Sequence, residues 1–346
     1  MRVAQITSTY LSVPPRSHGG TELMVYHLVE GLVARGHDVE LFASGDSNVS
    51  AELHAVVDVA TSYDDDCTTY VDKEMETRNT FNLYRRGGDF DVIHGHWPTL
   101  AAYFSPFTAT PTVLTYAYIE QELHDYYRAS FPNVHPVCIS RRQAENLGEP
   151  DLPVVPNGID VNATPFGAEG EDFLVIVGRI APNKGIADAI RIAKAAGDRL
   201  VIVGHAPPQL PWAERYYREE VEPHVDGDRV RHAAHLPNDE VLKLVSRAKG
   251  FLFPLQWEEP FGLAVAEALA VGTPVIAYPK GAMPEVIADG RTGFLVETEA
   301  EAVRAIARLS EIDRRACRAW VEEQFPISRM VEGYEAVYRS VAAISS

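Results

Sequence analysis

Short apolar segments alternate with segments of helical periodicity along this chain, and no other feature constrains its fold as much. Residues 2–6 (RVAQI) and 39–43 (VELFA) are apolar runs of strand length, and residues 21–35 between them carry apolar side chains near helical spacing. A strand, a helix and a strand in this order form a βαβ unit, whose strands are normally parallel. Further strands are predicted at 91–94, 112–116 and 135–139, with a helix from about Thr68.

The same alternation restarts in the second half of the chain. Residues 173–178 (FLVIVG) and 199–204 (RLVIVG) are predicted strands on either side of a helix at 186–196. Because 346 residues are too many for one ordinary core, the two copies predict an α/β protein with two Rossmann-like domains. Each domain is expected to be a doubly wound parallel sheet. Later strands are predicted at 250–254, 274–278 and 293–296.

Proline and glycine punctuate the join between the two copies, at residues 153–160 (PVVPNGID). We therefore expect an N-terminal domain at 1–155 and a C-terminal domain at 156–328. The last segment, 329–346, is amphipathic over most of its length. It is expected to form a helix that crosses back and completes the N-terminal domain.

Charge and cysteine content narrow the class of protein. The formal net charge is −18, from 49 acidic and 31 basic residues, and such a surface repels nucleic acid and anionic lipid. The three cysteines are far apart and lack metal-site spacing, which fits a reducing cytoplasm. The start of the chain lacks the apolar core of a signal peptide, and the apolar run 260–279 contains three prolines and Glu267. We therefore expect a cytoplasmic protein, with buried helix, turn and strand in that run.

Glu267 is a lone carboxylate in this apolar run and needs a physical reason. A helix is expected to begin near Gly262, and its first backbone N–H groups have no partner within the helix, so this end can bind phosphate. Glu267 lies about 6 Å further along at 1.5 Å per residue, which matches the separation of a nucleotide's diphosphate and ribose. A carboxylate there would accept hydrogen bonds from the ribose diol. The alternative is that Glu267 pairs with an internal arginine or caps a neighbouring helix.

A second acid and two basic residues support the phosphate interpretation. Glu259, just before the helix, would bind sugar hydroxyls or face developing positive charge. Arg179 and Lys184 lie in the loop VGRIAPNKG (177–185), between a predicted strand and a predicted helix. They would hold a diphosphate and neutralise it as a leaving group, the alternative being two solvated loop cations.

Two glycines in the N-terminal half stand at a comparable position. Gly19 and Gly20 (HGGTE, 18–22) lie between the first predicted strand and the first predicted helix. They would bring backbone N–H groups to the phosphate from the opposite side. Their spacing is not the G-x-G-x-x-G of dinucleotide-binding dehydrogenases.

These segments together resemble the family 4 retaining glycosyltransferases of the GT-B fold. EPFGLAVAEALAVGTPVIA (259–277) is similar to that family's signature of two glutamates separated by seven residues, and GRIAPNKG (178–185) to its phosphate loop. VVPNGID (154–160) resembles its inter-domain segment and PPRSHGGTE (14–22) its N-terminal loop. The resemblance spans nearly the whole chain, and its motifs are specific for the family but not for the substrate.

The resemblance implies a retaining hexosyltransferase whose two domains face each other across a cleft. A nucleotide-diphosphate sugar such as UDP-glucose or GDP-mannose would be held mainly by the C-terminal domain. The acceptor would be a hydroxyl group of a small molecule, a glycan or a lipid-linked molecule, and the leaving phosphate would take its proton. No cofactor and no obligatory metal are expected, and nothing in the sequence indicates the oligomeric state. The candidate catalytic residues are Glu259, Arg179 and Lys184, and the candidate substrate-binding residues are these three with Gly19, Gly20, Phe261, Gly262, Leu263 and Glu267.

One segment departs from the family pattern. Many relatives carry a histidine after the strand that matches 112–116, whereas this chain has Tyr116, Ala117 and Tyr118 there. A tyrosine hydroxyl or His124 would have to replace the missing contact to the donor sugar. The missing histidine raises the alternative of a degenerate nucleotide-sugar-binding protein, and a nucleotide-sugar epimerase or hydrolase on the same fold also stays open.

Two further polar segments resemble metal ligands without a complete set. His94 and His96 (HGHW) follow a predicted strand but lack an evident third ligand, so they are expected to line the cleft. The three aspartates at 64–66 are expected to form a solvated loop. We therefore predict no metal site.

Overall fold

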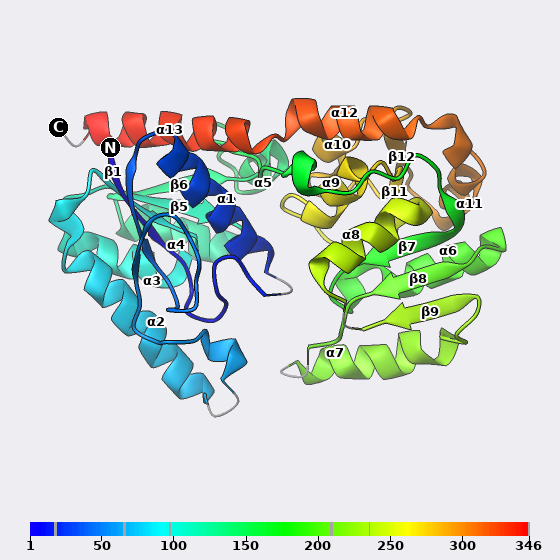
Figure 1. The fold of residues 1–346 in the computed structure, drawn as a ribbon, viewed down its shortest axis with the longest axis horizontal. Coiled ribbons are helices and arrows are strands. Elements are labelled where there is room, and N and C mark those ends of the chain that lie inside the picture. Colours follow the sequence, from blue (N-terminus) through cyan, green and yellow to red (C-terminus); the bar gives the residue numbers. More distant parts are fainter. Residues whose placement is uncertain (17–18, 65–66, 97, 208–209, 235, 345–346) are drawn as a thin grey trace. The chain divides into compact units, whose positions relative to one another are not determined.

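The computed structural model describes residues 1–16, 19–64, 67–96, 98–207, 210–234 and 236–344. The chain divides into two compact domains, shown in Figure 1. The N-terminal domain consists of Met1–Gly158 and Ile327–Ser346, and the C-terminal domain of Ile159–Pro326. The boundaries thus fall within three residues of the expected positions. The cleft expected between the domains stays a prediction.

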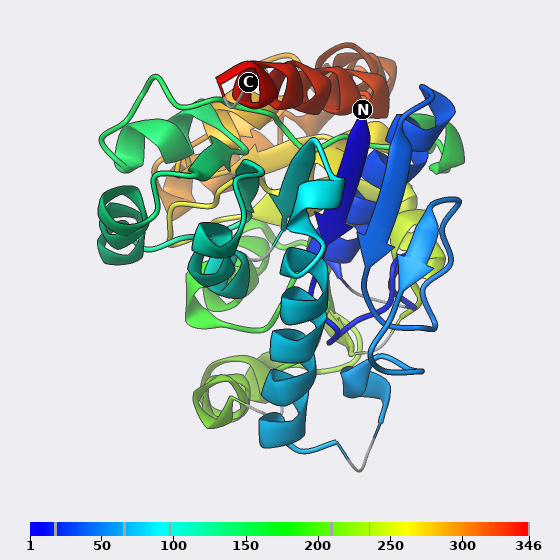
Figure 2. The ribbon, with the colours of Figure 1, turned by 90° about the vertical axis from the view of Figure 1, so that its left-hand side faces the viewer.

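The N-terminal domain is built on six parallel strands in the order β3-β2-β1-β4-β5-β6. Figure 2 shows the dark blue β1 beside β2, with the lighter blue β3 at the edge. The strands are β1 (Arg2–Ile6), β2 (Asp38–Phe42), β3 (Glu52–His54), β4 (Val92–Gly95), β5 (Thr112–Tyr116) and β6 (Val134–Cys138). The helices are α1 (Gly20–Ala34), α2 (Thr69–Tyr84), α3 (Pro98–Phe104), α4 (Gln121–Ser130), α5 (Arg141–Asn146) and α13 (Ile327–Ile344).

The C-terminal domain repeats this architecture with the strand order β12-β11-β10-β7-β8-β9, again all parallel. The strands are β7 (Glu171–Val177), β8 (Leu200–Val203), β9 (Val230–Ala233), β10 (Ala248–Phe253), β11 (Val275–Ala277) and β12 (Gly293–Leu295). The helices are α6 (Ile186–Ala196), α7 (Pro211–Tyr216), α8 (Asn238–Arg247), α9 (Leu263–Ala270), α10 (Met283–Val286), α11 (Glu299–Ile306) and α12 (Arg314–Gln324). The two parallel sheets confirm the predicted fold class.

Each sheet reverses its strand order beside its first strand. The chain runs outward from β1 to β2 and β3 and then returns to β4 on the other side of β1. In the C-terminal domain it runs outward from β7 and returns to β10 in the same way. Ligands of such sheets bind beyond the carboxyl ends of the strands at this reversal, so each domain has one favoured position for a site.

The C-terminal helix α13 packs within the N-terminal domain, beside α1 (Figure 1). Gly31 of α1 allows the close approach, because a Cβ atom there would lie 2.4 Å from Cγ2 of Val331. A buried polar network also joins α13 to the sheet: the Tyr338 hydroxyl accepts a hydrogen bond from Gln5 at 2.9 Å and lies 2.6 Å from Nδ1 of His94. The second network residue of α13, Tyr334, bonds through its hydroxyl to the strand β5.

Two strands, β3 and β9, were not predicted, whereas the other ten lie within two residues of the predicted bounds. Both missed strands are at sheet edges and are short and polar, with the sequences ELH and VRHA. A central parallel strand is covered on both faces, so its sequence is a continuous apolar run. An edge strand is partly exposed and can contain polar residues.

Candidate active site

The loop that follows β7 is shaped by two glycines. Gly178 ends the strand with φ +156°, and Gly185 starts α6 with φ +70°. A Cβ atom on Gly185 would lie 2.1 Å from the carbonyl oxygen of Pro254, at the end of β10. The backbone N–H of Gln256 also donates to the carbonyl of Asn183 at 2.8 Å. The loops after β7 and β10 are thus fastened together at the reversal point of the sheet.

The two basic residues of this loop have different surroundings. Arg179 is exposed and makes no hydrogen bond or ion pair with any residue in the described ranges. Lys184 is largely buried and forms an ion pair with Glu259. Its ammonium also lies 4.8 Å from the ring of Trp257, a cation–π distance. The alternative of two solvated cations is therefore wrong for Lys184.

Glu259 is held by the segment around it. One carboxylate oxygen, Oε2, accepts hydrogen bonds from Lys184 and from the indole N–H of Trp257, the latter at 2.8 Å. The Glu259 carbonyl accepts from the N–H of Ala282 at 2.8 Å. Its Cγ atom lies 3.6 Å from the position of a Cβ on Gly262, so this acid stands against the start of α9. The sequence did not single out Trp257, and only its place two residues before Glu259 could have drawn attention to it.

Helix α9 begins at an uncapped glycine. Gly262 has φ +90° and lies in the left-handed region, where glycine is favoured, and no side chain caps the helix. The N–H groups of Val265 and Ala266 bond to the Gly262 carbonyl, whereas those of Leu263 and Ala264 have no partner among the residues described. These two N–H groups are available to an anion. Phe261 is different, because its side chain is buried against Phe325 and leaves only its backbone to contact a ligand.

Glu267 lies one turn into α9 and makes no hydrogen bond or ion pair with the described part of the chain. The alternative of an internal arginine partner or a helix cap is therefore not supported. The side chain is partly exposed, yet loss of surrounding water raises its pKa to about 7. A carboxyl group in this state gains from a ligand that donates hydrogen bonds to it.

In the N-terminal domain, Gly19 and Gly20 lie where α1 begins after the loop that follows β1. Gly19 has φ +147°, and a Cβ atom there would lie 2.8 Å from Cβ of Pro15, so glycine is needed. No side chain caps α1, although Glu22 of its first turn is buried, and burial raises the pKa of this acid. The adjoining residues 17–18 lie outside the described residues.

The segment that departs from the family pattern places its tyrosine inside the domain. Tyr116 is fully buried in the core, and its ring packs edge-on against His124 at 5.7 Å between centroids. His124 is itself buried and bonds to Glu149 through Nε2 at 3.0 Å. Neither side chain reaches the surface of this domain in the structure, whereas Tyr118 is half exposed.

The two histidines that resembled metal ligands are hydrogen-bonded to other side chains inside the N-terminal domain. His94 is buried, with Nδ1 bonded to Tyr338 and Nε2 to Thr115, so both nitrogens are occupied by protein. Burial also lowers the pKa of both His94 and His96. Of the aspartates 64–66, residues 65 and 66 lie outside the described residues.

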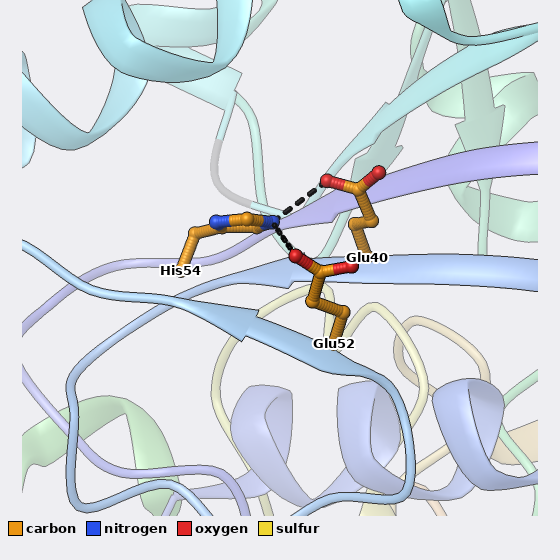
Figure 3. A group of neighbouring side chains, drawn as sticks. All are labelled: Glu40, Glu52 and His54. Carbon is orange, nitrogen blue, oxygen red and sulfur yellow. Dashed lines mark hydrogen bonds and ion pairs between the residues drawn. The ribbon is translucent and has the colours of Figure 1, made fainter.

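Figure 3 shows a cluster on β2 and β3 whose three side chains offer ligand atoms within 4.8 Å of one another: Glu40, Glu52 and His54. His54 lies 2.7 Å from the Glu40 carboxylate and 3.4 Å from that of Glu52. However, Arg2 and Arg86 also contact Glu40 at 2.8 Å each. Burial raises the pKa of Glu40, but hydrogen bonds from these arginines and His54 outweigh it and lower the pKa. Because two guanidinium groups already neutralise the buried carboxylate, we interpret the cluster as an ion-pair network.

Two doubly wound parallel-sheet domains on one chain, with Lys184 and Glu259 paired near the uncapped start of α9, are typical of the GT-B glycosyltransferases. Comparison with known proteins identifies the family. The model "Glycosyl transferases group 1" matches residues 163–324, and the model "Glycosyltransferase Family 4" matches residues 18–163. The chain belongs to the family 4 glycosyltransferases, as the resemblance of its motifs indicated.

Individual relatives agree with this assignment. A glycogen synthase of Mycobacterium tuberculosis is 28% identical over 85% of this chain and 81% of its own length. A phosphatidyl-myo-inositol mannosyltransferase of Mycolicibacterium smegmatis is 27% identical over 86% of this chain and 81% of its own length. The crystal structure of the Anabaena protein HepE in complex with UDP-glucose has the same fold, with a TM-score of 0.74 and 15% identity over 98% of this chain and all of that one. No helix within the described ranges is long and apolar enough to cross a bilayer.

Proposed function

We propose that this glycosyltransferase is a retaining enzyme that transfers a hexose from a nucleotide-diphosphate sugar to a hydroxyl group. The observation that carries the proposal is Glu267, a carboxyl group without a partner among the described residues, one turn into a helix whose N–H groups at Leu263 and Ala264 have no partner among them either. About 6 Å separates these groups along the helix axis, which suits a diphosphate at the helix start and a ribose diol on the acid.

In this proposal the diphosphate is held by charge and by backbone. Arg179 and Lys184 neutralise it together with the N–H groups of Leu263 and Ala264. These donors strengthen their hold as the bond to the sugar breaks and negative charge builds up on the leaving phosphate. Arg179 has no competing acid among the described residues, so it is available without rearrangement.

Lys184 and Glu259 are paired in the ligand-free protein, and donor binding would divide them. A diphosphate carries more charge than one carboxylate and would compete for the Lys184 ammonium. Glu259 would remain bonded to Trp257 at 2.8 Å and offer its second oxygen, Oε1, to a hexose hydroxyl. The ion pair thus keeps both groups in place before the donor arrives.

The leaving phosphate itself would take the acceptor's proton, so no protein base is required. With two basic residues and a helix start at the diphosphate, the site provides positive charge without a divalent ion. The three cysteines form no disulfide, which supports a reducing compartment such as the cytoplasm.

Calorimetry with UDP-glucose and GDP-mannose tests the donor site. UDP-glucose is the ligand of the Anabaena structure and the first donor to try. Glu267→Gln and Lys184→Met should each weaken donor binding at least tenfold, because each removes charge-assisted hydrogen bonds. Glu240→Gln, at an exposed acid of α8 paired with Lys243, is the matched control and should bind as wild type. Equal donor affinity in all four proteins would refute the assignment.

Product analysis separates transfer from the two remaining functions. NMR of the product should show the anomeric configuration of the donor sugar and no loss of donor without an acceptor. Donor loss without an acceptor would indicate a hydrolase or an epimerase. Binding without any turnover would indicate a degenerate binding protein, the alternative that the missing histidine raised.

A further inference from the structure

Trp257 contacts both a cation and an acid of the candidate site, and no motif of the sequence points to it. Its indole N–H donates to Oε2 of Glu259 at 2.8 Å, and the Lys184 ammonium lies 4.8 Å from the centre of its ring. The face of the ring attracts a cation, and the N–H at its edge binds an anion. One side chain therefore contacts both partners of the ion pair between Lys184 and Glu259.

The backbone around Trp257 is held on both sides. The N–H of Gln256 donates at 2.8 Å to a carbonyl of the loop after β7, which carries Lys184. The N–H of Glu259 donates to the carbonyl of Trp257 at 3.1 Å, and the Glu259 carbonyl accepts from Ala282 at 2.8 Å. With the backbone held in this way, the position of the Glu259 carboxylate depends on the rotation of its side chain, which its hydrogen bonds restrain.

The two hydrogen bonds to Oε2 of Glu259 differ in how easily they are lost. Lys184 carries its ammonium on a long flexible stem, and a diphosphate would draw that ammonium away from the carboxylate. The indole of Trp257 is a rigid donor without a charge, so a phosphate does not compete for it in the same way. Once Lys184 has turned to a diphosphate, Trp257 is the partner that still holds Oε2.

We propose that Trp257 is a positioning residue that makes the site prefer a nucleotide-diphosphate sugar to the free nucleotide-diphosphate. This inference rests on the proposed function, because it assumes that Lys184 binds the diphosphate and that Glu259 binds a hexose hydroxyl. Trp257 keeps Oε1 of Glu259 directed at the sugar after Lys184 has left the ion pair. When no sugar is bound, the same carboxylate stays within reach of Lys184 and competes with the diphosphate for it.

Trp257→Phe isolates the indole N–H, because it keeps an aromatic face beside Lys184 and removes the bond to Glu259. The measured quantity is a ratio of two affinities from calorimetry: UDP-glucose over UDP, or GDP-mannose over GDP, whichever pair the wild type binds more tightly. This ratio should fall about tenfold in Trp257→Phe, since a charge-assisted hydrogen bond that holds the carboxylate is lost. In a Glu259→Ala background, Trp257→Phe should leave the ratio unchanged, because Trp257 acts through that carboxylate.

Trp320→Phe is the matched control in the same domain. Both tryptophans are half-buried, and the Trp320 indole N–H also donates at 2.8 Å, to the carbonyl of Val286. Arg291 lies 5.5 Å from the centre of the Trp320 ring, so this side chain too contacts a cation. Trp320→Phe removes the same kind of hydrogen bond and should leave the affinity ratio as in the wild type. If Trp257 served stability alone, the two variants would change the melting temperature and the ratio alike.

NMR of the tryptophan indole N–H groups follows the hydrogen bond itself without any reaction. The signal that disappears in Trp257→Phe belongs to Trp257, and Glu259→Gln should shift it because the acceptor loses its charge. Titration with UDP-glucose or GDP-mannose should leave this N–H slow to exchange with water, since the bond persists when the donor is bound. Faster exchange in the donor complex would overturn the proposal.

Three results of the affinity measurements would also overturn it: the ratio in Trp257→Phe equals that of the wild type, the ratio in Trp320→Phe falls equally, or Trp257→Phe still lowers it without Glu259. Failure of the proposed function would look different. If neither donor binds while Glu259→Gln still shifts the Trp257 signal, the hydrogen bond exists but the proposed function falls, and this role of Trp257 falls with it. If a donor is bound and transferred but the ratio ignores Trp257, the proposed function stands and this role falls.

Discussion

The state of Glu267 makes donor affinity depend on pH in a way that can be calculated. Its pKa in the ligand-free protein is raised to about 7 by loss of water. If the ribose diol requires the ionised carboxylate, the apparent affinity falls tenfold for each pH unit below 7. Between pH 8 and pH 5 the dissociation constant should therefore rise about 100-fold, or about 2.7 kcal/mol at 1.36 kcal/mol per pH unit.

The choice of ligand decides whether this measurement is clean. The terminal phosphate of a free nucleotide titrates near pH 6 and would impose its own pH dependence. UDP-glucose and GDP-mannose avoid this problem, because each of their two phosphates is linked on both sides and neither has a terminal oxygen that titrates near pH 6. Calorimetry in buffers of different ionisation enthalpy should also show release of about half a proton on binding at pH 7.

Two variants separate Glu267 from other titrating groups. Glu267→Gln should bind the donor more weakly and with almost the same affinity from pH 5 to pH 8. Glu240→Gln should reproduce the wild-type profile. A wild-type affinity that does not change over this range, or a profile that survives in Glu267→Gln, would refute the role of this carboxylate.

Three further predictions concern folding stability. Because the pKa of Glu267 is raised in the folded protein, the unfolded chain ionises first, and the free energy of unfolding falls as pH rises from about 4.5 to about 7. Glu267→Gln should therefore raise the free energy of unfolding at pH 8 by at most about 3 kcal/mol, seen as a higher melting temperature, but should not raise it at pH 4. Gly262→Ala and Gly290→Ala share a positive φ and should each cost about 1–3 kcal/mol in chemical denaturation, but only the first should also lose donor binding in calorimetry. Hydrogen bonds from Arg35 lower the pKa of Glu335 to about 2. The ionised carboxylate therefore stabilises the folded protein above about pH 4.5, and this stabilisation is lost as pH falls toward 2. In urea titrations, Glu335→Gln should have a free energy of unfolding about 2 kcal/mol below that of the wild type at pH 7, and the difference should disappear in acid.

The fold was predictable because its central strands are covered on both faces. Runs such as 173–178 and 199–204 are apolar at almost every position, and each was assigned correctly. The edges were not predictable in this way: β3 and β9 pair on one side only and tolerate polar residues. The return of α13 to the N-terminal domain was expected, but its contacts were not: its buried tyrosines bond across more than 200 residues of sequence, which no local pattern reveals.

The candidate residues of the C-terminal domain stand out in the sequence, whereas the buried acid of α2, Glu76, does not. Glu267 was noticed because a carboxylate contrasts with an apolar run. Glu76 lies in a polar, acidic stretch where one more acid has no contrast, and its burial results only from packing against β1 and α3. The pairing of Lys184 with Glu259 was also hidden, because 75 residues separate them in sequence.

The two sheets present different groups at the points where their strand orders reverse. At the end of β7, an uncapped helix start and two basic residues offer positive charge. At the end of β1, the middle of α2 contributes Glu76 and Thr80, a carboxylate and a hydroxyl, because the backbone N–H groups there are used within the helix, while the uncapped start of α1 follows the same strand. On a chain of net charge −18, a phosphate is stable only where dedicated cations meet it. Glycosyl transfer from a nucleotide-diphosphate sugar would need such a local gathering of positive charge, because its leaving group is an anion.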